Sequence, residues 1–391
     1  MRFPHRTIVL LGIVTIAAYG AWNYAFGVLL DPILTDTGWS ESWVAASFSL
    51  STALGALMAM PAGRLIDRAG SRPAFLIAAT ACTVGLVTAS STSQLAVFMV
   101  GAAVGGGSLN AFAFYHITQT TAVRVAPETP ARAIALLTIY GAFSSTIYLP
   151  TAAALVSVTS WRVTLRILAL TTAAVLVIGA VAVRERDRAP GARVKPDFAA
   201  AFGRPAARRF VIATGLIGLG VGTVLVYQVP LMTEAGLTIG TAAWIAGARG
   251  AAQVTGRIPL PWILARLGAR SSIRLAFISI TVGLSMLFFA GNVVVALAYV
   301  ALAGFGIGAT SPLQGIYADE LFERAHLGAC MGVLTMVFGF SVALGPAMVG
   351  VLAEHTGNRW WGILVAAMAG TGAVIQMSRP LPDDEIPALS A

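Results

Sequence analysis

Long apolar segments recur along the whole chain and restrict its fold more than any other feature. Charged residues make up 10% of the 391 residues, and the mean hydropathy is +0.82. In an ordinary soluble domain about a quarter of the residues are charged. About 20 apolar residues in a helix cross the hydrocarbon of a bilayer, and such a helix satisfies its own backbone there. The sequence therefore predicts an all-α integral membrane protein.

Twelve membrane-spanning segments are predicted, in two sets of six. They lie at 7–30, 42–62, 73–92, 94–116, 133–153, 161–183, 210–232, 240–262, 272–291, 293–314, 328–351 and 360–379. A basic stretch at 185–208 separates the two sets. We therefore expect an N-terminal six-helix bundle over 1–184, a cytoplasmic linker over 185–208 and a C-terminal six-helix bundle over 209–391.

The two halves look like copies of one unit. A charged, glycine-bounded run, Gly63–Arg72, is answered 198 residues later by Pro261–Arg270. The same offset links Pro32–Gly38 with Pro230–Gly236, and the Trp161-Arg162 pair with Arg359-Trp360. Self-similarity of this kind indicates repeated architecture. We expect the two bundles to be related by a pseudo-twofold axis.

The arginines indicate the orientation of the chain. They gather in the segments that share a side with the N-terminus, and cytoplasmic loops are the ones enriched in Lys and Arg. Both termini are therefore expected in the cytoplasm, with the protein in the cell's inner (plasma) membrane. Topology also accounts for the net charge of +9, so no nucleic-acid partner is expected. Cys82 and Cys330 fall in apolar segments of different halves, and no disulfide is indicated.

The run Gly63–Arg72 resembles the G-x-L-x-D-R-x-G-x-R loop of major facilitator superfamily transporters. The resemblance covers essentially the whole chain and implies that this loop is a latch for one conformation. The latch residues would be Gly63, Asp67, Arg68, Gly70 and Arg72. The second copy of the loop has an alanine in place of the aspartate, which implies a weaker latch in the second half.

A narrower resemblance is to the oxalate:formate antiporter and monocarboxylate transporter branch. It is carried by Tyr24–Gly27 followed by Gly38–Ser40, and by Gly256-Arg257 in the eighth segment. It implies that Arg257 binds substrate. In proton-coupled monocarboxylate transporters an aspartate stands four residues before this arginine, whereas this chain has Gln253. The branch's lysine in the first segment is also absent, which argues against strict proton symport.

The eighth segment carries two arginines within an otherwise apolar helix. At 100° per residue, Arg249, Gln253 and Arg257 form one stripe. An arginine in the middle of a membrane costs about 2.5–3.5 kcal/mol, and its planar fork suits a carboxylate. The stripe is therefore a candidate anion site facing a central passage. For Arg249 the alternative is a side chain that extends to the membrane interface.

Polar and aromatic residues of other segments are further candidates for substrate binding. Tyr19, Asn23 and Phe26 share a face of the first segment, Tyr140 and Tyr148 share one on the fifth, and Tyr227 lies in the seventh. Hydrogen bonding between helices is the alternative role for the polar members, because polar groups in hydrocarbon seek partners.

Hydrolase and nucleotide-binding motifs are absent from the sequence, including H-E-x-x-H, G-x-S-x-G and the Walker A loop. We therefore expect no enzyme, no cofactor and no metal, but a gradient-driven transporter. The expected cargo is a small organic anion, and a monocarboxylate is favoured. The alternatives are an efflux pump for a hydrophobic drug or metabolite, and a membrane sensor that does not transport. The expected partners are the small-molecule substrate, the lipid bilayer, and protons or a counter-anion for coupling. The chain is expected to be a monomer.

Overall fold

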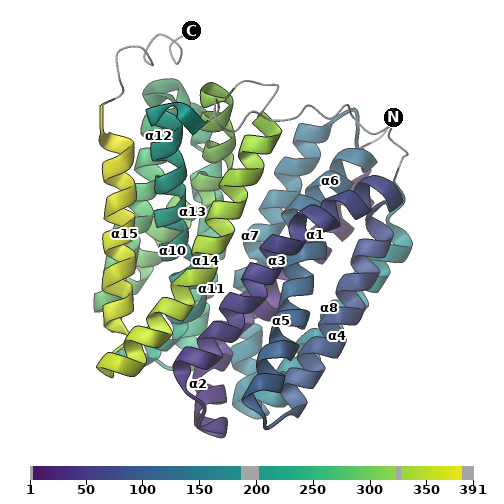
Figure 1. The fold of residues 1–391 in the computed structure, drawn as a ribbon, viewed down its shortest axis with the longest axis vertical. Helices are drawn as coiled ribbons and strands as arrows, with labels where there is room; N and C mark the ends of the chain where they lie inside the picture. Colours follow the sequence, from purple (N-terminus) through teal and green to yellow (C-terminus); the bar gives the residue numbers. More distant parts are fainter. Residues whose placement is uncertain (1–2, 186–201, 323–326, 381–391) are drawn as a thin grey trace.

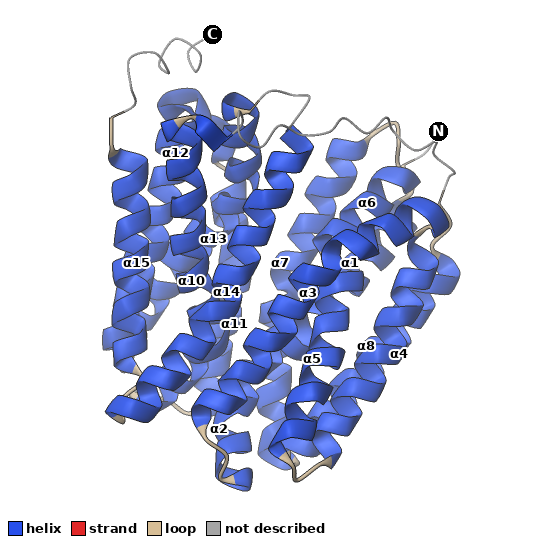
Figure 2. Ribbon diagram, in the orientation of Figure 1, coloured by secondary structure: helices blue, strands red, loops and turns tan. Residues whose placement is uncertain are grey.

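A computed structural model describes residues 3–185, 202–322 and 327–380. Within these ranges the chain consists of helices and short connections, and none of the described residues lies in a strand (Figure 2). The predicted all-α fold is confirmed. Most of the predicted linker, 186–201, lies outside the described residues.

Two six-helix bundles make up the molecule (Figure 1). The first contains α1 (His5–Tyr19), the π-helix η1 (Gly20–Tyr24), α2 (Ala25–Thr37), α3 (Glu41–Ala69), α4 (Ser71–Ser91), α5 (Leu95–Phe112), α6 (Tyr115–Val125), α7 (Pro130–Val158) and α8 (Trp161–Ala182). The second contains α10 (Pro205–Glu234), α11 (Ile239–Arg257), α12 (Leu260–Met286), the short 3-10 turn η2 (Leu287–Phe289), α13 (Val293–Leu321), α14 (Leu327–Thr356) and α15 (Trp360–Ser378). Where helices that follow one another directly are counted as one segment, eleven of the described helical segments are long and apolar enough to cross a membrane. The twelfth crossing contains α11, which carries the predicted arginine stripe.

Backbone geometry confirms the internal repeat. Gly38 and Gly236 are 198 residues apart and both end a helix with positive φ, 66° and 99°. Gly70 and Gly268 have the same separation and nearly the same φ, 73° and 71°. Only glycine adopts such angles without a steric penalty, so the repeated glycines fix equivalent turns in both halves. The segment equivalent to α3 is 239–267, which is α11 together with the first part of α12.

These four turns define the two ends of the molecule. We call the end with Gly38 and Gly236 the distal end, and the end with Gly70 and Gly268 the linker end. Three exposed tryptophans, Trp43, Trp244 and Trp361, lie near the distal starts of their helices. Tryptophans gather at the membrane–water interface, so these mark one boundary of the lipid-facing surface.

Three predicted segment boundaries were wrong. The fourth crossing does not end at 116, because after a break at Ala113 and Phe114 it continues as α6 to Val125. The eighth and ninth crossings are not separated by a loop at 263–271, because the helix continues to a sharp turn at Gly268. The first crossing extends to Thr37 and contains a π-helical turn. Hydropathy alone detects none of these breaks.

The bundles contact each other mainly along two helix pairs, α7 with α11 and α3 with α14, and also where α2 packs on α10. The second pair, α3 with α14, runs side by side across the middle of Figure 1. Near the distal end, Gly350 of α14 lies so close to Ser42 and Ala45 that a Cβ there would be 3.0 Å from each. Toward the linker end the contact is lost, since Gly63 of α3 and Gly332 of α14 would have no atom within 4 Å of an added Cβ.

Candidate functional site

The arginine stripe lies at the middle of its membrane crossing. Gln253 is fourteen residues from both Ile239 and Leu267, and one helical turn on either side of it are Arg249 and Arg257. Arg249 is 1% exposed and Gln253 is 6% exposed, whereas Arg257 is half-buried. Arg249 and Gln253 are therefore enclosed by protein, and Arg257 is partly enclosed, at the depth where a charge is most costly in lipid.

Arg249 is held inside the second bundle. Its Nε donates to Oε1 of Gln228 at 3.1 Å, and the Tyr299 hydroxyl donates to the same oxygen at 2.6 Å. The Nη2 of Arg249 and the Nε2 of Gln228 are buried donors without a hydrogen-bond partner. Leaving such a donor unpaired costs about 1–3 kcal/mol, and more for a charged group. A ligand that offers a hydrogen-bond acceptor to these two donors would therefore bind with a gain in free energy.

Arg257 reaches from the second bundle to the first. One Nη donates to the backbone carbonyl of Thr138 in α7, Nε donates to the carbonyl of Gly308 at 3.3 Å, and the other Nη approaches Oε1 of Gln253 at 3.5 Å. All three acceptors are neutral. A carboxylate forms stronger, charge-assisted hydrogen bonds with a guanidinium, so it can displace these acceptors.

Two helix irregularities in the first bundle converge near Arg257. The π-helical turn η1 follows Tyr19 in the first crossing and ends at Tyr24, and the break in the fourth crossing precedes Tyr115. The Tyr19 ring stacks on Phe114 with 3.7 Å between centroids and lies 5.1 Å from the ring of Tyr115. The Tyr115 hydroxyl donates to the same Thr138 carbonyl that Arg257 uses, at 3.3 Å. Single π-turns in α-helices are frequent at functional sites.

The remaining predicted site residues of the first bundle make their contacts within that bundle. Asn23 donates to Asn110 at 2.8 Å, which is a bond between helices. Phe26 is 0% exposed and packs on Trp22 and Phe48, so it lines no accessible surface in this conformation.

Tyr140 and Tyr148 pack against α1 and η1. Their rings cover Gly12 and Gly20, where an added Cβ would be 2.6 Å and 2.1 Å from ring atoms. The Tyr148 hydroxyl is 3.5 Å from Thr172 of α8. Tyr227 is fully buried in α10, and Arg359 lies over its ring at 5.9 Å, toward the distal end. The structure therefore brings Tyr19 to the arginine stripe, but not these three.

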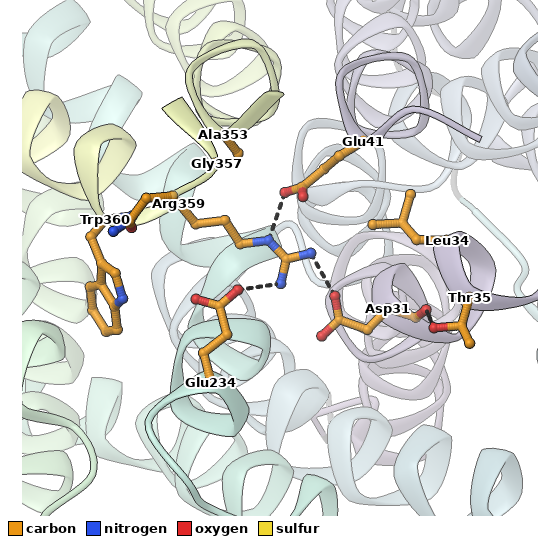
Figure 3. Close-up of a pocket in the computed structure, with 10 residues that line it drawn as sticks. Asp31, Leu34, Thr35, Glu41, Glu234, Ala353, Gly357, Arg359 and Trp360 are labelled. Atoms are coloured by element: carbon orange, nitrogen blue, oxygen red, sulfur yellow. Dashed lines mark hydrogen bonds and ion pairs between the residues drawn. The ribbon is translucent and has the colours of Figure 1, made fainter. Parts of the chain in front are cut away.

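An ion-pair network joins the bundles at the distal end (Figure 3). Arg359 contacts Asp31 at 2.7 Å and Glu41 at 2.8 Å in the first bundle, and Glu234 at 2.8 Å in its own. Burial lowers the pKa of the Arg359 guanidinium, but its bonds to Glu41 and Asp31 outweigh burial and raise that pKa above its ordinary value. The network lines a pocket of about 700 Å³.

At the linker end, the predicted latch loop has partners in its own bundle. Asp67 pairs with Arg124 at 2.9 Å, and the same arginine pairs with Glu185 at 3.2 Å. The carboxylate of Glu185 also accepts the backbone N–H of Ser71 at 2.6 Å, which caps the first turn of α4. Gly70, with a φ of 73°, makes the tight turn between α3 and α4.

The other latch residues contact less of the protein. Arg68 and Arg72 are exposed and line a pocket of about 390 Å³ beside the turn. Gly63 faces open space, because an added Cβ there would have no atom of a neighbouring helix within 4 Å.

Sequence reasoning missed the groups that join distant segments. The sequence does not predict the ion pair between Arg124 and Glu185, or the three ion pairs that Arg359 makes with acidic residues. It also does not indicate Phe114 and Tyr115 as the ring partners of Tyr19. The internal repeat contains one signal for the ion pair of Glu234 with Arg359. Glu234 is the copy of Asp36, and Asp36 pairs with Arg162 at 3.1 Å in the first bundle. Across the described ranges, no three His, Cys, Asp or Glu side chains are grouped so that they could hold a metal ion.

Comparisons with known proteins agree with this architecture. The family model of the Major Facilitator Superfamily matches residues 11–209 and again residues 210–390. No curated protein sequence matches significantly.

Several solved structures share the fold at low identity. A mutant of the nucleoside transporter NupG superposes with a TM-score of 0.81 at 13% identity, covering 95% of this chain and 98% of that one. A bacterial homologue of the human lysosomal transporter Spinster gives 0.74 at 13% identity, with coverages of 100% and 95%. A D-xylose–proton symporter gives 0.73 at 13% identity, with coverages of 98% and 99%. Twelve crossings in two repeated bundles, matched by the family model in both halves, show that this chain is a multi-pass membrane protein of the Major Facilitator Superfamily and a transporter of small molecules rather than an enzyme.

Proposed function

We propose that this transporter carries a small organic anion, most simply a monocarboxylate, whose carboxylate binds Arg257 with Arg249 behind it. One observation carries the proposal: at mid-crossing, a buried and a half-buried arginine face only neutral acceptors, and one Nη of Arg249 has no partner. Among the described residues, no carboxylate lies within 4 Å of either arginine. An anionic ligand would supply the missing countercharge.

The distal ion pairs and the separation of Gly63 from α14 support a route to the site from the linker end. We propose that the linker end is cytoplasmic, as the arginine distribution predicts, so that this conformation faces inward. Transport then alternates between this conformation and one in which the distal network opens and the latch loop closes against α14, as in other carriers with repeated bundles. Gln253 in the stripe is not titratable, so uniport or anion exchange is favoured over proton symport through this helix.

Uptake by purified protein in liposomes tests the proposal. Saturable uptake of a labelled monocarboxylate is expected, and Arg257→Gln should lower it about ten- to hundredfold, because a charge-assisted hydrogen bond contributes about 1.5–3 kcal/mol. Arg208→Gln is the control, since Arg208 is an exposed arginine near the start of α10, outside the stripe and outside both copies of the latch loop. Equal uptake by the two variants would remove Arg257 from the site. Uptake of nucleosides or sugars, but of no carboxylate, would overturn the anion proposal.

A further inference from the structure

We infer that the anion carried by this protein has a flat aromatic body, as in an arenecarboxylate. The inference rests on the proposed anion site at Arg257 and adds the part of the ligand that the guanidinium does not recognise. The second bundle supplies the positive charge, and the first bundle supplies an aromatic wall directly beside it.

The wall consists of Tyr19, Tyr24, Phe114 and Tyr115. Tyr19 lies at its centre, stacked on Phe114 at 3.7 Å and 14°, with Tyr115 at 5.1 Å and Tyr24 at 6.5 Å. Arg257 lies beside this wall, because its Nη and the Tyr115 hydroxyl donate to the same backbone carbonyl of Thr138. A ligand whose carboxylate binds Arg257 therefore places its organic body against these rings.

Both edges of the wall depend on broken helical geometry. A regular helix would continue through Gly20–Tyr24 and through Ala113–Phe114, and would turn Tyr24 and Tyr115 to other directions. Irregular backbone at membrane depth occurs where it is enclosed by protein or lines a passage. Two such breaks in separate crossings that meet at one aromatic cluster indicate a binding surface rather than packing.

Accessibility separates this wall from the other aromatic cluster of the first bundle. Trp22, Phe26 and Phe48 also contact one another, but each is 0% exposed, so no ligand can reach them. Of the wall residues, Tyr24 is buried, whereas Tyr19, Phe114 and Tyr115 are only half-buried, so these three are the ones that a ligand would contact. Aromatic rings prefer aromatic partners in offset or edge-to-face contact, which a saturated ring of equal size cannot match.

Ligand binding to the purified full-length protein tests the inference, with benzoate, cyclohexanecarboxylate, acetate and benzamide as probes. Benzoate should bind about tenfold more tightly than cyclohexanecarboxylate, the size expected for one aromatic contact. Benzamide has the ring but no charge and should not bind measurably. Phe114→Leu should reduce the preference for benzoate to less than about twofold while cyclohexanecarboxylate still binds. The matched control is Phe288→Leu, because Phe288 stacks on Trp360 in the second bundle, 5.6 Å between centroids, away from Arg257.

The outcomes separate this inference from the function on which it rests. Equal affinity for benzoate and cyclohexanecarboxylate, with both lost in Arg257→Gln, would overturn the aromatic wall but leave the anion site. A preference for benzoate that survives Phe114→Leu would also overturn it. If no carboxylate binds, or if binding is unchanged in Arg257→Gln, the proposed anion site fails and the inference fails with it.

Discussion

Replacing Arg359 by glutamine should open the distal end of the transporter. Two of its bonds cross between the bundles, Nε to Glu41 at 2.8 Å and Nη2 to Asp31 at 2.7 Å. Hydrogen bonds to charged groups contribute about 1.5–3 kcal/mol each, but the Asp31 side chain is 41% exposed, so solvent reduces its share to about 1 kcal/mol. The Glu41 side chain is 17% exposed and keeps about 2 kcal/mol. Their loss, about 3 kcal/mol together, shifts the balance toward the distally open conformation on the order of a hundredfold.

Cysteine labelling from the distal side measures this shift. Ala45→Cys is the reporter, because Ala45 is buried against Gly350 of the other bundle and becomes reachable when α3 and α14 separate. The native Cys82 and Cys330 are buried and would be replaced by alanine to remove background. Labelling by a membrane-impermeant maleimide should be much faster in Arg359→Gln than in the parent.

Arg162→Gln is the matched control for charge and position. Arg162 belongs to the arginine–tryptophan pair that repeats around Arg359, but its partner Asp36 is in its own bundle, so its loss should leave the labelling rate unchanged. Glu234→Gln should also have little effect, since its bond to Arg359 lies within the second bundle. Equal acceleration by Arg162→Gln and Arg359→Gln would refute the assignment of the network as a closure between bundles.

Three further predictions concern the helix contacts. Gly63→Leu should abolish transport, because the antiparallel register of α3 and α14 brings Gly63 opposite Gly332 when the two helices close on each other. The melting temperature should not fall, because nothing lies within 4 Å of an added Cβ in this conformation. Normal uptake would contradict this prediction, and Gly240→Leu, at a glycine that also faces open space, is the control. Asp67→Asn should abolish uptake while costing less than about 1 kcal/mol of stability, because Asp67 is 58% exposed, and unchanged uptake in liposomes would disprove the latch. Gly222→Ala should lower the thermal stability by about 1–3 kcal/mol, because its Cβ would be 2.0 Å from the Val342 carbonyl, and an unchanged melting curve would rule out this contact.

Much of the fold could be predicted from the sequence because its signals are local or periodic. Apolar length predicts the crossings, and the offset of 198 residues predicts the equivalent turns at Gly70 and Gly268. The arginine stripe followed from helical spacing alone. Each of these signals lies within one segment or within two copies of one segment.

The remainder depends on contacts between segments far apart in the chain. Arg359 meets Glu41 and Asp31 across 318 and 328 residues, and no pattern in one sequence indicates such a pairing. The breaks at Gly20–Tyr24 and Ala113–Phe114 replace regular hydrogen bonds through tertiary packing, such as the Tyr148 ring over Gly20. Consequently Tyr19 was identified from its helix face, but Phe114 and Tyr115 were not identified as its partners.

The position of Arg257 links binding to movement. In this conformation its guanidinium donates to Thr138 of the opposite bundle, so it is at once the proposed anion ligand and a contact between α7 and α11. A carboxylate that binds this guanidinium displaces the Thr138 carbonyl, so a hydrogen bond between the bundles is lost. The ligand's own contacts to the two bundles replace it. The empty and loaded carriers then differ in the free energy of the same interface, which is the condition for a ligand to shift a conformational equilibrium. A charge confined to one bundle, as Arg249 is, contributes affinity without this linkage.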